Sequence, residues 1–213
     1  MMDKTTLQQA LSVKETPNLD KIAQLAVIDK EILQLVLSGL TSKQNAHRDN
    51  CFQVLYQISG RRPHVLYPAW TYFVTLLSSP NAFHRGMAVR LIADLTRIDD
   101  AQRFEAIFET YFDLLDDDKV MVSRYLAQNA WKIAEAKPHM REKITARLLD
   151  IDATHHSPSR KALIKADIIT SFEVFFQESK HKESIRDFVK AQLESDSPKA
   201  RQAASAFLRR YGQ

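Results

Sequence analysis

Five arginines recur along the chain at nearly constant spacing, and this recurrence constrains the fold more than any other feature of the sequence. The successive intervals are 37, 39, 36 and 41 residues, and each arginine opens an apolar helical stretch that follows a short break. Periods near 40 residues are typical of stacked helix pairs, so the sequence predicts a helical repeat array. The recurring residues are Arg48, Arg85, Arg124, Arg160 and Arg201.

The scarcity of turn residues supports the same fold class. Only four glycines and seven prolines interrupt 213 residues, and the stretches between them are rich in good helix formers. Sandwiches and barrels need far more turns, and we find no convincing strand pattern. With 45% hydrophobic residues the chain can bury a continuous core. The composition therefore predicts an all-α protein of long helices joined by short turns.

Each predicted repeat contains two helices separated by a polar break. In the second repeat, Pro63 opens a first helix whose apolar stripe extends to Leu77, and residues 78–81 separate it from a second helix with an apolar face at 87–95. Two further helices are expected upstream, at residues 3–12 and 19–28, around the break Thr16-Pro17-Asn18. We expect residues 1–28 to form an N-terminal helical cap and residues 29–213 to form the repeats of a single domain.

The repeat pattern resembles the HEAT repeat. The best match is the stretch Asp-Ser-Pro-Lys-Ala-Arg-Gln-Ala-Ala at residues 196–204. In that family the turn Asp and the helix Arg form a hydrogen-bonded ladder between adjacent units, so the resemblance implies structural roles for Asp196 and Arg201. Ser79 stands near the Asp position in the second repeat, which departs from the pattern. The four remaining recurrent arginines match the family's Arg position: Arg48, Arg85, Arg124 and Arg160.

The resemblance also implies an architecture and a binding surface. It predicts a right-handed, curved α-α superhelix of about five repeats, whose second helices line a concave face. Charged and polar residues on these helices that neither the core nor the ladder requires are the candidate binding residues. They are Arg90, Asp94, Arg97, Asn129, Lys132 and Lys165. We predict a non-enzymatic scaffold that binds a protein or peptide partner, because stacked repeats present many preformed contacts.

The charge distribution keeps a second function open. Residues 1–118 carry 12 basic against 15 acidic side chains, whereas residues 119–213 carry 18 against 11. A basic C-terminal half favours polyanionic partners, so nucleic-acid binding through a basic track is the alternative. Bacterial alkylpurine DNA glycosylases are built on similar repeats, which would give Asp94 a place beside Arg90. No stretch matches their active site residue by residue, and we expect Trp70 and Trp131 to lie in the core.

Motifs for other chemistry are weak in this sequence. The most metal-like pair is His155-His156, near Asp152, but adjacent loop histidines do not themselves supply a third and fourth ligand, so we expect neither metal nor cofactor. The single cysteine, Cys51, is expected to be a buried small side chain. We see no signal peptide at the N-terminus and no stretch approaching about 20 apolar residues, so we expect a cytoplasmic protein that is not inserted in a membrane.

Overall fold

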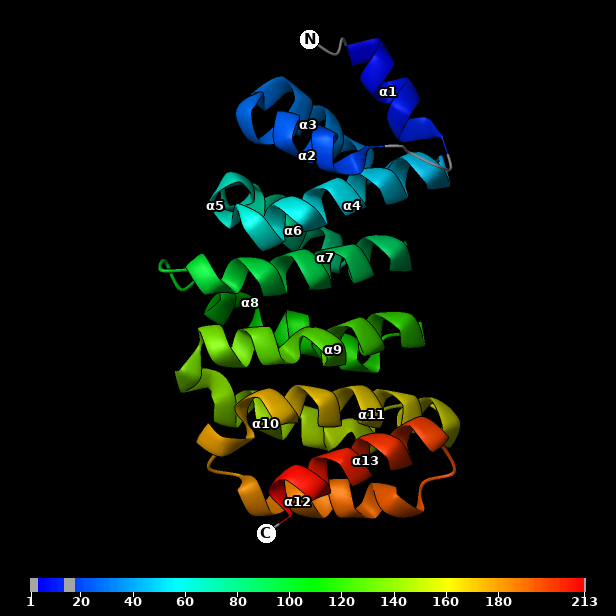
Figure 1. Cartoon of the computed structure of the whole chain (residues 1–213), viewed down its shortest axis with the longest axis vertical. Coiled ribbons are helices and arrows are strands. Elements are labelled where there is room, and N and C mark those ends of the chain that lie inside the picture. Colours follow the sequence, from blue (N-terminus) through cyan, green and yellow to red (C-terminus); the bar gives the residue numbers. More distant parts are fainter. Residues whose placement is uncertain (1–3, 14–17, 213) are drawn as a thin grey trace. The chain divides into compact units, whose positions relative to one another are not determined.

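The computed structural model describes residues 4–13 and 18–212. All regular structure in these ranges is α-helix or 3-10 helix, which confirms the predicted all-α class (Figure 1). Among the helices of these ranges, none combines the length and apolar character needed to cross a membrane. Residue 3, where the first helix was expected to begin, and residues 16 and 17 of the predicted break lie outside the described residues.

The chain forms two compact units, Met1–Ile98 and Asp99–Gln213. The single domain predicted over residues 1–213, with its cap at residues 1–28, remains a prediction. In unit 1, α1 and α2 both contact α4, and α2 also contacts α3. The helices of unit 1 are α1 (Lys4–Ser12), α2 (Leu19–Ile28), α3 (Lys30–Gly39), α4 (Asn45–Arg61), α5 (Pro63–Leu66), η1 (Tyr67–Ala69), α6 (Trp70–Leu77), α7 (Ala82–Leu95) and η2 (Thr96–Ile98).

Side-chain caps define where the first helices of unit 1 begin. The side chain of Asn18 accepts a hydrogen bond from the backbone N–H of Lys21 at the start of α2. Asp29 accepts from the N–H groups of Glu31 and Ile32 and so separates α2 from α3. Such caps satisfy N–H groups that have no partner within the helix. Asp29 therefore marks the start of α3, whereas the predicted boundary between cap and repeats at residue 29 remains a prediction.

The first helix of the second pair is interrupted, which the sequence pattern did not predict. We expected one helix from Pro63 to Leu77, but the structure has α5, the 3-10 turn η1 and then α6. Pro68 lies in η1, and proline lacks the N–H that would donate to the carbonyl of the preceding turn. The apolar stripe still reaches the core, since Leu66, Trp70 and Phe73 are buried. Pro68 breaks the backbone regularity and leaves the packing pattern intact.

Unit 2 contains three further helix pairs. Its second helices lie side by side, with α9 packed on α11 and α11 packed on α13 (Figure 1). The helices of unit 2 are α8 (Arg103–Phe112), η3 (Asp113–Asp116), α9 (Val120–Ala136), η4 (Pro138–Met140), α10 (Arg141–Leu149), η5 (Asp150–Ala153), α11 (Pro158–Phe175), η6 (Phe176–Glu178), α12 (Lys182–Ala191), η7 (Gln192–Glu194) and α13 (Pro198–Tyr211).

Aromatic side chains fill the core of unit 2 between first and second helices. Phe172 on α11 meets Phe188 on α12 edge to face with ring centroids 6.0 Å apart, and Phe176 meets Phe207 edge to face at 4.9 Å. Both geometries are favourable for aromatic pairs. The core therefore fixes the relative position of the helices within this unit. Its largest fully buried side chains are Phe104, Phe108, Tyr111, Phe112, Phe172, Phe175, Phe176 and Phe207.

Candidate functional site

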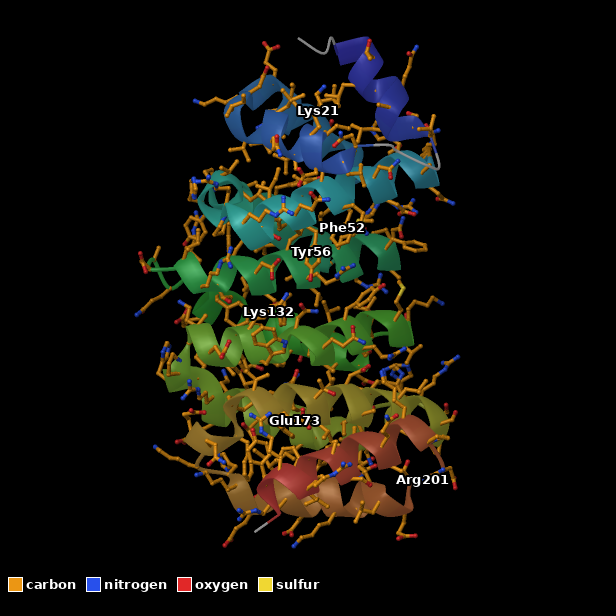
Figure 2. The ribbon with its side chains drawn as sticks, in the orientation of Figure 1. Lys21, Phe52, Tyr56, Lys132, Glu173 and Arg201 are labelled. Atoms are coloured by element: carbon orange, nitrogen blue, oxygen red, sulfur yellow. The ribbon has the colours of Figure 1, made fainter. Side chains whose placement is uncertain are left out.

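Arg90, the first predicted binding residue, packs on two aromatic rings of the neighbouring second helix. Its guanidinium carbon lies 4.5 Å from the ring centroid of Phe52 and 4.3 Å from that of Tyr56. Figure 2 shows these two rings on α4, and their centroids are 5.5 Å apart. A guanidinium over an aromatic face is held by cation-π attraction. Arg90 is half-buried, so its side chain joins α7 to α4 within unit 1.

The other two predicted binding residues of unit 1 hold the C-terminal end of α4. Asp94 is buried and accepts a hydrogen bond of 2.6 Å from the hydroxyl of Ser59. Arg97 donates from one terminal nitrogen to the carbonyls of Ser59 and Gly60, at 2.7 and 2.6 Å. The last carbonyls of a helix lack intrahelical donors, and a cation there also interacts favourably with the helix dipole. Asp94 and Arg97 therefore stabilise the packing of α7 and η2 against the C-terminal end of α4.

In unit 2, the predicted binding residues are also engaged with their own chain. Asn129 is buried and donates to the carbonyl of Tyr125 in the same helix, at 2.7 Å. Lys132, labelled on α9 in Figure 2, is half-buried with its amine 5.8 Å from the Trp131 ring. The amine of Lys165 lies 2.8 Å from a carboxylate oxygen of Asp152.

The structure therefore groups the six predicted residues into two sets. Arg90, Asp94 and Arg97 gather on α7 and η2 against α4, whereas Asn129, Lys132 and Lys165 lie on α9 and α11. Asn129 and Asp94 are too buried to meet a partner without movement of their surroundings. A binding role for the six residues remains a prediction.

Three of the recurrent arginines hold the start of their own helix. Arg85 donates to the carbonyl of Ser79 at 2.7 Å, and Arg201 donates to that of Ser195 at 2.5 Å. Both carbonyls belong to the turn that precedes the arginine's helix. Arg48 is buried and donates to the side chain of Asn45 in the first turn of α4. The common position of these arginines is explained by this local role in the turn.

Arg124 instead bridges two repeats. Its Nε lies 2.7 Å from Oδ2 of Asp167 on α11, and the amine of Lys199 on α13 lies 2.7 Å from Oδ1 of the same carboxylate. Asp167 is buried, so one acidic group joins three successive second helices. The hydrogen bond from Arg124 to Asp167 raises the pKa of the Arg124 guanidinium. Arg160 and Asp196, the remaining ladder candidates, are both exposed.

Asp167 was missed by the sequence analysis, although a signal for it exists. It stands in the apolar stretch Ala166-Asp167-Ile168-Ile169, where an unpaired acidic side chain would be costly to bury. A lone acid inside an apolar helical run predicts a cationic partner from a neighbouring element. Lys137 was also missed, because residues 135–139 form no apolar run, although its buried amine lies 2.9 Å from the buried carboxylate of Asp99.

The structure changes the expected partner of the loop histidines. Asp152 pairs with Lys165, whereas His155 contacts Asp116, with 2.5 Å between Nδ1 and Oδ1. His156 is buried next to it. Burial lowers the pKa of the His156 imidazole, and the charges of His155 and Arg160 lower it further, so the ring is neutral near pH 7. Asp116, His155 and His156 are the group of the described residues close enough to share a metal ion.

The residues considered for enzymatic roles lie mostly inside the structure. Trp70 is buried in unit 1, and Asp94 is buried and accepts a hydrogen bond from Ser59. Trp131, also expected in the core, is half-buried. Cys51 is buried, as expected, and burial raises the pKa of its thiol to about 12. A thiol with this pKa is almost entirely protonated at neutral pH and is a poor nucleophile.

A groove on unit 2 brings one predicted binding residue to the surface. It lies between the N-terminal half of α11 and the segment that joins α12 to α13. Its lining mixes apolar side chains with charges of both signs, and Lys165 is among them. The lining residues used below are Asp152, Lys161, Ala162, Leu163, Lys165 and Glu194.

Comparison with known structures supports the fold. The crystal structure of an engineered protein is similar over 97% of this chain and 96% of its own, with a TM-score of 0.50 and 14% identity. The chain is an all-α solenoid of helix pairs. A designed armadillo repeat protein is similar over 98% of this chain and 94% of its own, with a TM-score of 0.45 and 18% identity. No protein-family model matches the sequence, and no curated protein matches it.

Proposed function

We propose that this all-α solenoid is a non-enzymatic scaffold that binds a protein segment in the groove beside α11. The observation that carries the proposal is the mixed character of that groove. Leu163 and Ala162 offer apolar contact area, while Lys161, Lys165 and Glu194 add charges of both signs to the lining. Interfaces between proteins combine an apolar centre with a charged rim in this way.

The charges of the groove favour a polypeptide over a polyanion. Lys165 is paired with the carboxylate of Asp152, and Lys161 donates to the backbone carbonyl of the same residue at 2.7 Å. Phosphate binding would have to compete with these contacts and would bring negative charge near Asp152 and Glu194. Arg124 and Lys199 are also less available to a polyanion, because both cations bind Asp167.

The surface beside the groove is suited to binding because it is preorganised. Asp167 is held by Arg124 from α9 and by Lys199 from α13, so α11 is fixed to both of its neighbours. A rigid surface loses little conformational entropy on binding, and a flexible partner then bears most of the ordering cost.

The proposal includes a cytoplasmic location. The single buried cysteine supports this location, because reducing compartments keep thiols free.

The test uses a photo-crosslinking amino acid at Ala162 in the groove and, as a matched control, at Ala146 on α10. We expect crosslinks to a discrete protein partner from cell extract at position 162 and none of that product at position 146. With the crosslinker kept at position 162, filling the groove with Ala191→Trp should abolish capture, whereas Ala146→Trp should leave it unchanged. Equal capture at both positions, or capture at position 162 that survives Ala191→Trp, would contradict the proposed surface.

A second measurement separates this function from the nucleic-acid alternative. Fluorescence anisotropy with duplex DNA, single-stranded DNA and RNA, each at several salt concentrations, measures polyanion binding directly. We expect weak binding that lacks a steep salt dependence. Tight binding with a steep salt slope would instead favour nucleic-acid recognition and would justify an assay for release of alkylated bases.

A further inference from the structure

Two successive turns of unit 2 bring an acidic residue and two histidines together. Asp116 ends η3 in the third helix pair, whereas His155 and His156 precede α11 in the fourth. Each of the three residues offers one ligand atom, and these atoms lie within 4.8 Å of one another. The two imidazole rings have centroids 4.5 Å apart. Residues almost 40 positions apart in the sequence thus form one compact cluster of metal-binding side chains.

Asp116 is already oriented by His155. Its Oδ1 accepts a hydrogen bond of 2.8 Å from the backbone N–H of His155 and lies 2.5 Å from Nδ1 of the same residue. Both side chains are 49% exposed, so ions in solution can reach them. The backbone hydrogen bond fixes the carboxylate independently of the imidazole. A metal ion can therefore take the place of the proton between the two side chains without releasing the loop.

His156 supplies the observation that points to a ligand. Its side chain is buried, at 3% exposure, and its Nε2 lies 2.9 Å from the Ser123 hydroxyl and 3.3 Å from the Leu115 carbonyl. Its Nδ1 is buried and has no hydrogen-bond partner among the described residues. Leaving a buried polar atom unpaired costs about 1–3 kcal/mol. A metal ion bound at Nδ1 would satisfy this nitrogen.

We propose that Asp116, His155 and His156 bind a zinc ion. Two imidazole nitrogens and one carboxylate oxygen are a donor set that Zn²⁺ prefers. His156 would bind through Nδ1 while its Nε2–H donates to the Leu115 carbonyl, and this second contact is the outer interaction that normally orients a ligating histidine. His155 would bind through Nδ1, and its proton then resides on Nε2. A fourth position remains for water or for a side chain of a partner.

The geometry requires only small movements of the three side chains. Bonds of about 2.0–2.1 Å in a tetrahedral site place ligand atoms roughly 3.4 Å apart. The three ligand atoms lie within 4.8 Å of one another, and those of Asp116 and His155 are 2.5 Å apart, so rotations of these two side chains must separate them slightly and bring them toward His156. The ion would tie the end of η3 to the loop before α11, and hence the third helix pair to the fourth. The site would stabilise unit 2 independently of any binding partner.

The test is a zinc titration of the full chain, first freed of metal with a chelator, in which isothermal titration calorimetry measures the binding. We expect one site per chain, a thermal midpoint that rises with Zn²⁺, and the visible bands of tetrahedral Co²⁺ when that ion is used instead. His155→Ala and Asp116→Asn should each weaken the affinity at least about 100-fold. Both residues are half-exposed, so these variants should fold, which circular dichroism would verify.

His139 offers a matched control in the same unit. It is an exposed histidine whose Nε2 lies 3.0 Å from the carboxylate of Glu105, but it has no second histidine beside it. His139→Ala should leave zinc affinity and the Co²⁺ bands unchanged. The proposal is overturned if the chain shows no saturable zinc site, or if His155→Ala and Asp116→Asn bind zinc as the unaltered chain does. An equal loss in His139→Ala would also overturn it.

Discussion

Arg124 and Asp167 form the ion pair that joins α9 to α11, the second helices of two successive helix pairs, with 2.7 Å between Nε and Oδ2. The carboxylate is 4% exposed and the guanidinium 31% exposed, so the pair lies partly shielded from water. Lys199 reaches the other carboxylate oxygen from α13. Buried carboxylates require compensation by charge and hydrogen bonds, and Asp167 receives both from its two neighbouring helices.

Asp167→Asn should lower the free energy of unfolding by about 1–3 kcal/mol, because the amide cannot accept two charged donors. Arg124→Gln should cost less, since Lys199 still neutralises the carboxylate. In a double-mutant cycle measured by urea unfolding, the two substitutions should couple by about 1 kcal/mol. Strictly additive effects would show that the pair does not link the two helices.

An exposed pair in the same unit provides the comparison for that cycle. Lys143 on α10 lies 2.7 Å from the carboxylate of Glu109 on α8, but both side chains are more than half exposed. Exposed ion pairs contribute little because water screens the charges and the side chains lose entropy. Lys143→Gln should therefore change stability by less than about 0.5 kcal/mol. A cost equal to that of Asp167→Asn would show that burial is not what distinguishes the two pairs.

Lys137→Met should be more damaging than either of these changes. The amine of Lys137 lies 2.9 Å from a carboxylate oxygen of Asp99 and 2.7 Å from the Asp99 backbone carbonyl, and both side chains are buried. Removing one partner of a buried pair leaves an uncompensated charge and typically costs about 3–5 kcal/mol. Thermal and urea unfolding measure the loss. A cost below that of Arg124→Gln would contradict this interpretation.

Gly39→Ala should destabilise unit 1 by about 1–3 kcal/mol through overpacking. A Cβ atom at this position would overlap the sulfur of Cys51 and come within 2.9 Å of the His47 ring. The glycine thus permits the close contact between α3 and α4. Adding Cys51→Ala to Gly39→Ala should restore part of the lost stability, because it removes the overlapping sulfur. Absence of any rescue in urea unfolding would show that the clash lies elsewhere.

His84 should make unit 1 less stable as the pH falls below its unfolded pKa of about 6.5. Burial lowers the pKa of His84 in the folded chain, and the charge of Arg48 lowers it further. Protons then bind the unfolded chain more readily, so stability is lost as pH falls through this window. In His84→Gln, the urea midpoint should decline less between about pH 8 and pH 5.5. An identical decline in both proteins would exclude His84 as a contributor.

Several features of the fold could be read from the residues because they depend on local chemistry. The recurrent arginines and polar breaks predicted helix pairs with little strand character, and the structure is all-helical over the described residues. The break expected at Thr16-Pro17-Asn18 ends where Asn18 caps α2, because short polar side chains satisfy the free N–H groups of a helix start. The break at Pro68 was missed, although proline in a helix interior is itself a local signal.

The pairing of charged side chains depended on which helices come together. The sequence showed Arg90, Arg97 and Lys165 as surplus charge, but the structure places them on an aromatic pair, on helix-end carbonyls and on Asp152. Each of these partners lies 13 or more residues away, and helical periodicity carries no information about such distances. A charge on a helix face looks the same in sequence whether solvent or another repeat lies against it.

The amino-acid sequence alone therefore determined the helical class, the repeat period and the apolar faces that stack the pairs. These follow from propensities, breaks and spacing within about 40 residues. Only the tertiary structure decided that Arg124 meets Asp167 and that Asp116 meets His155, because each pair is made by the register of one repeat on the next. Stacking geometry sets that register, and it depends on how whole helices pack rather than on any local pattern.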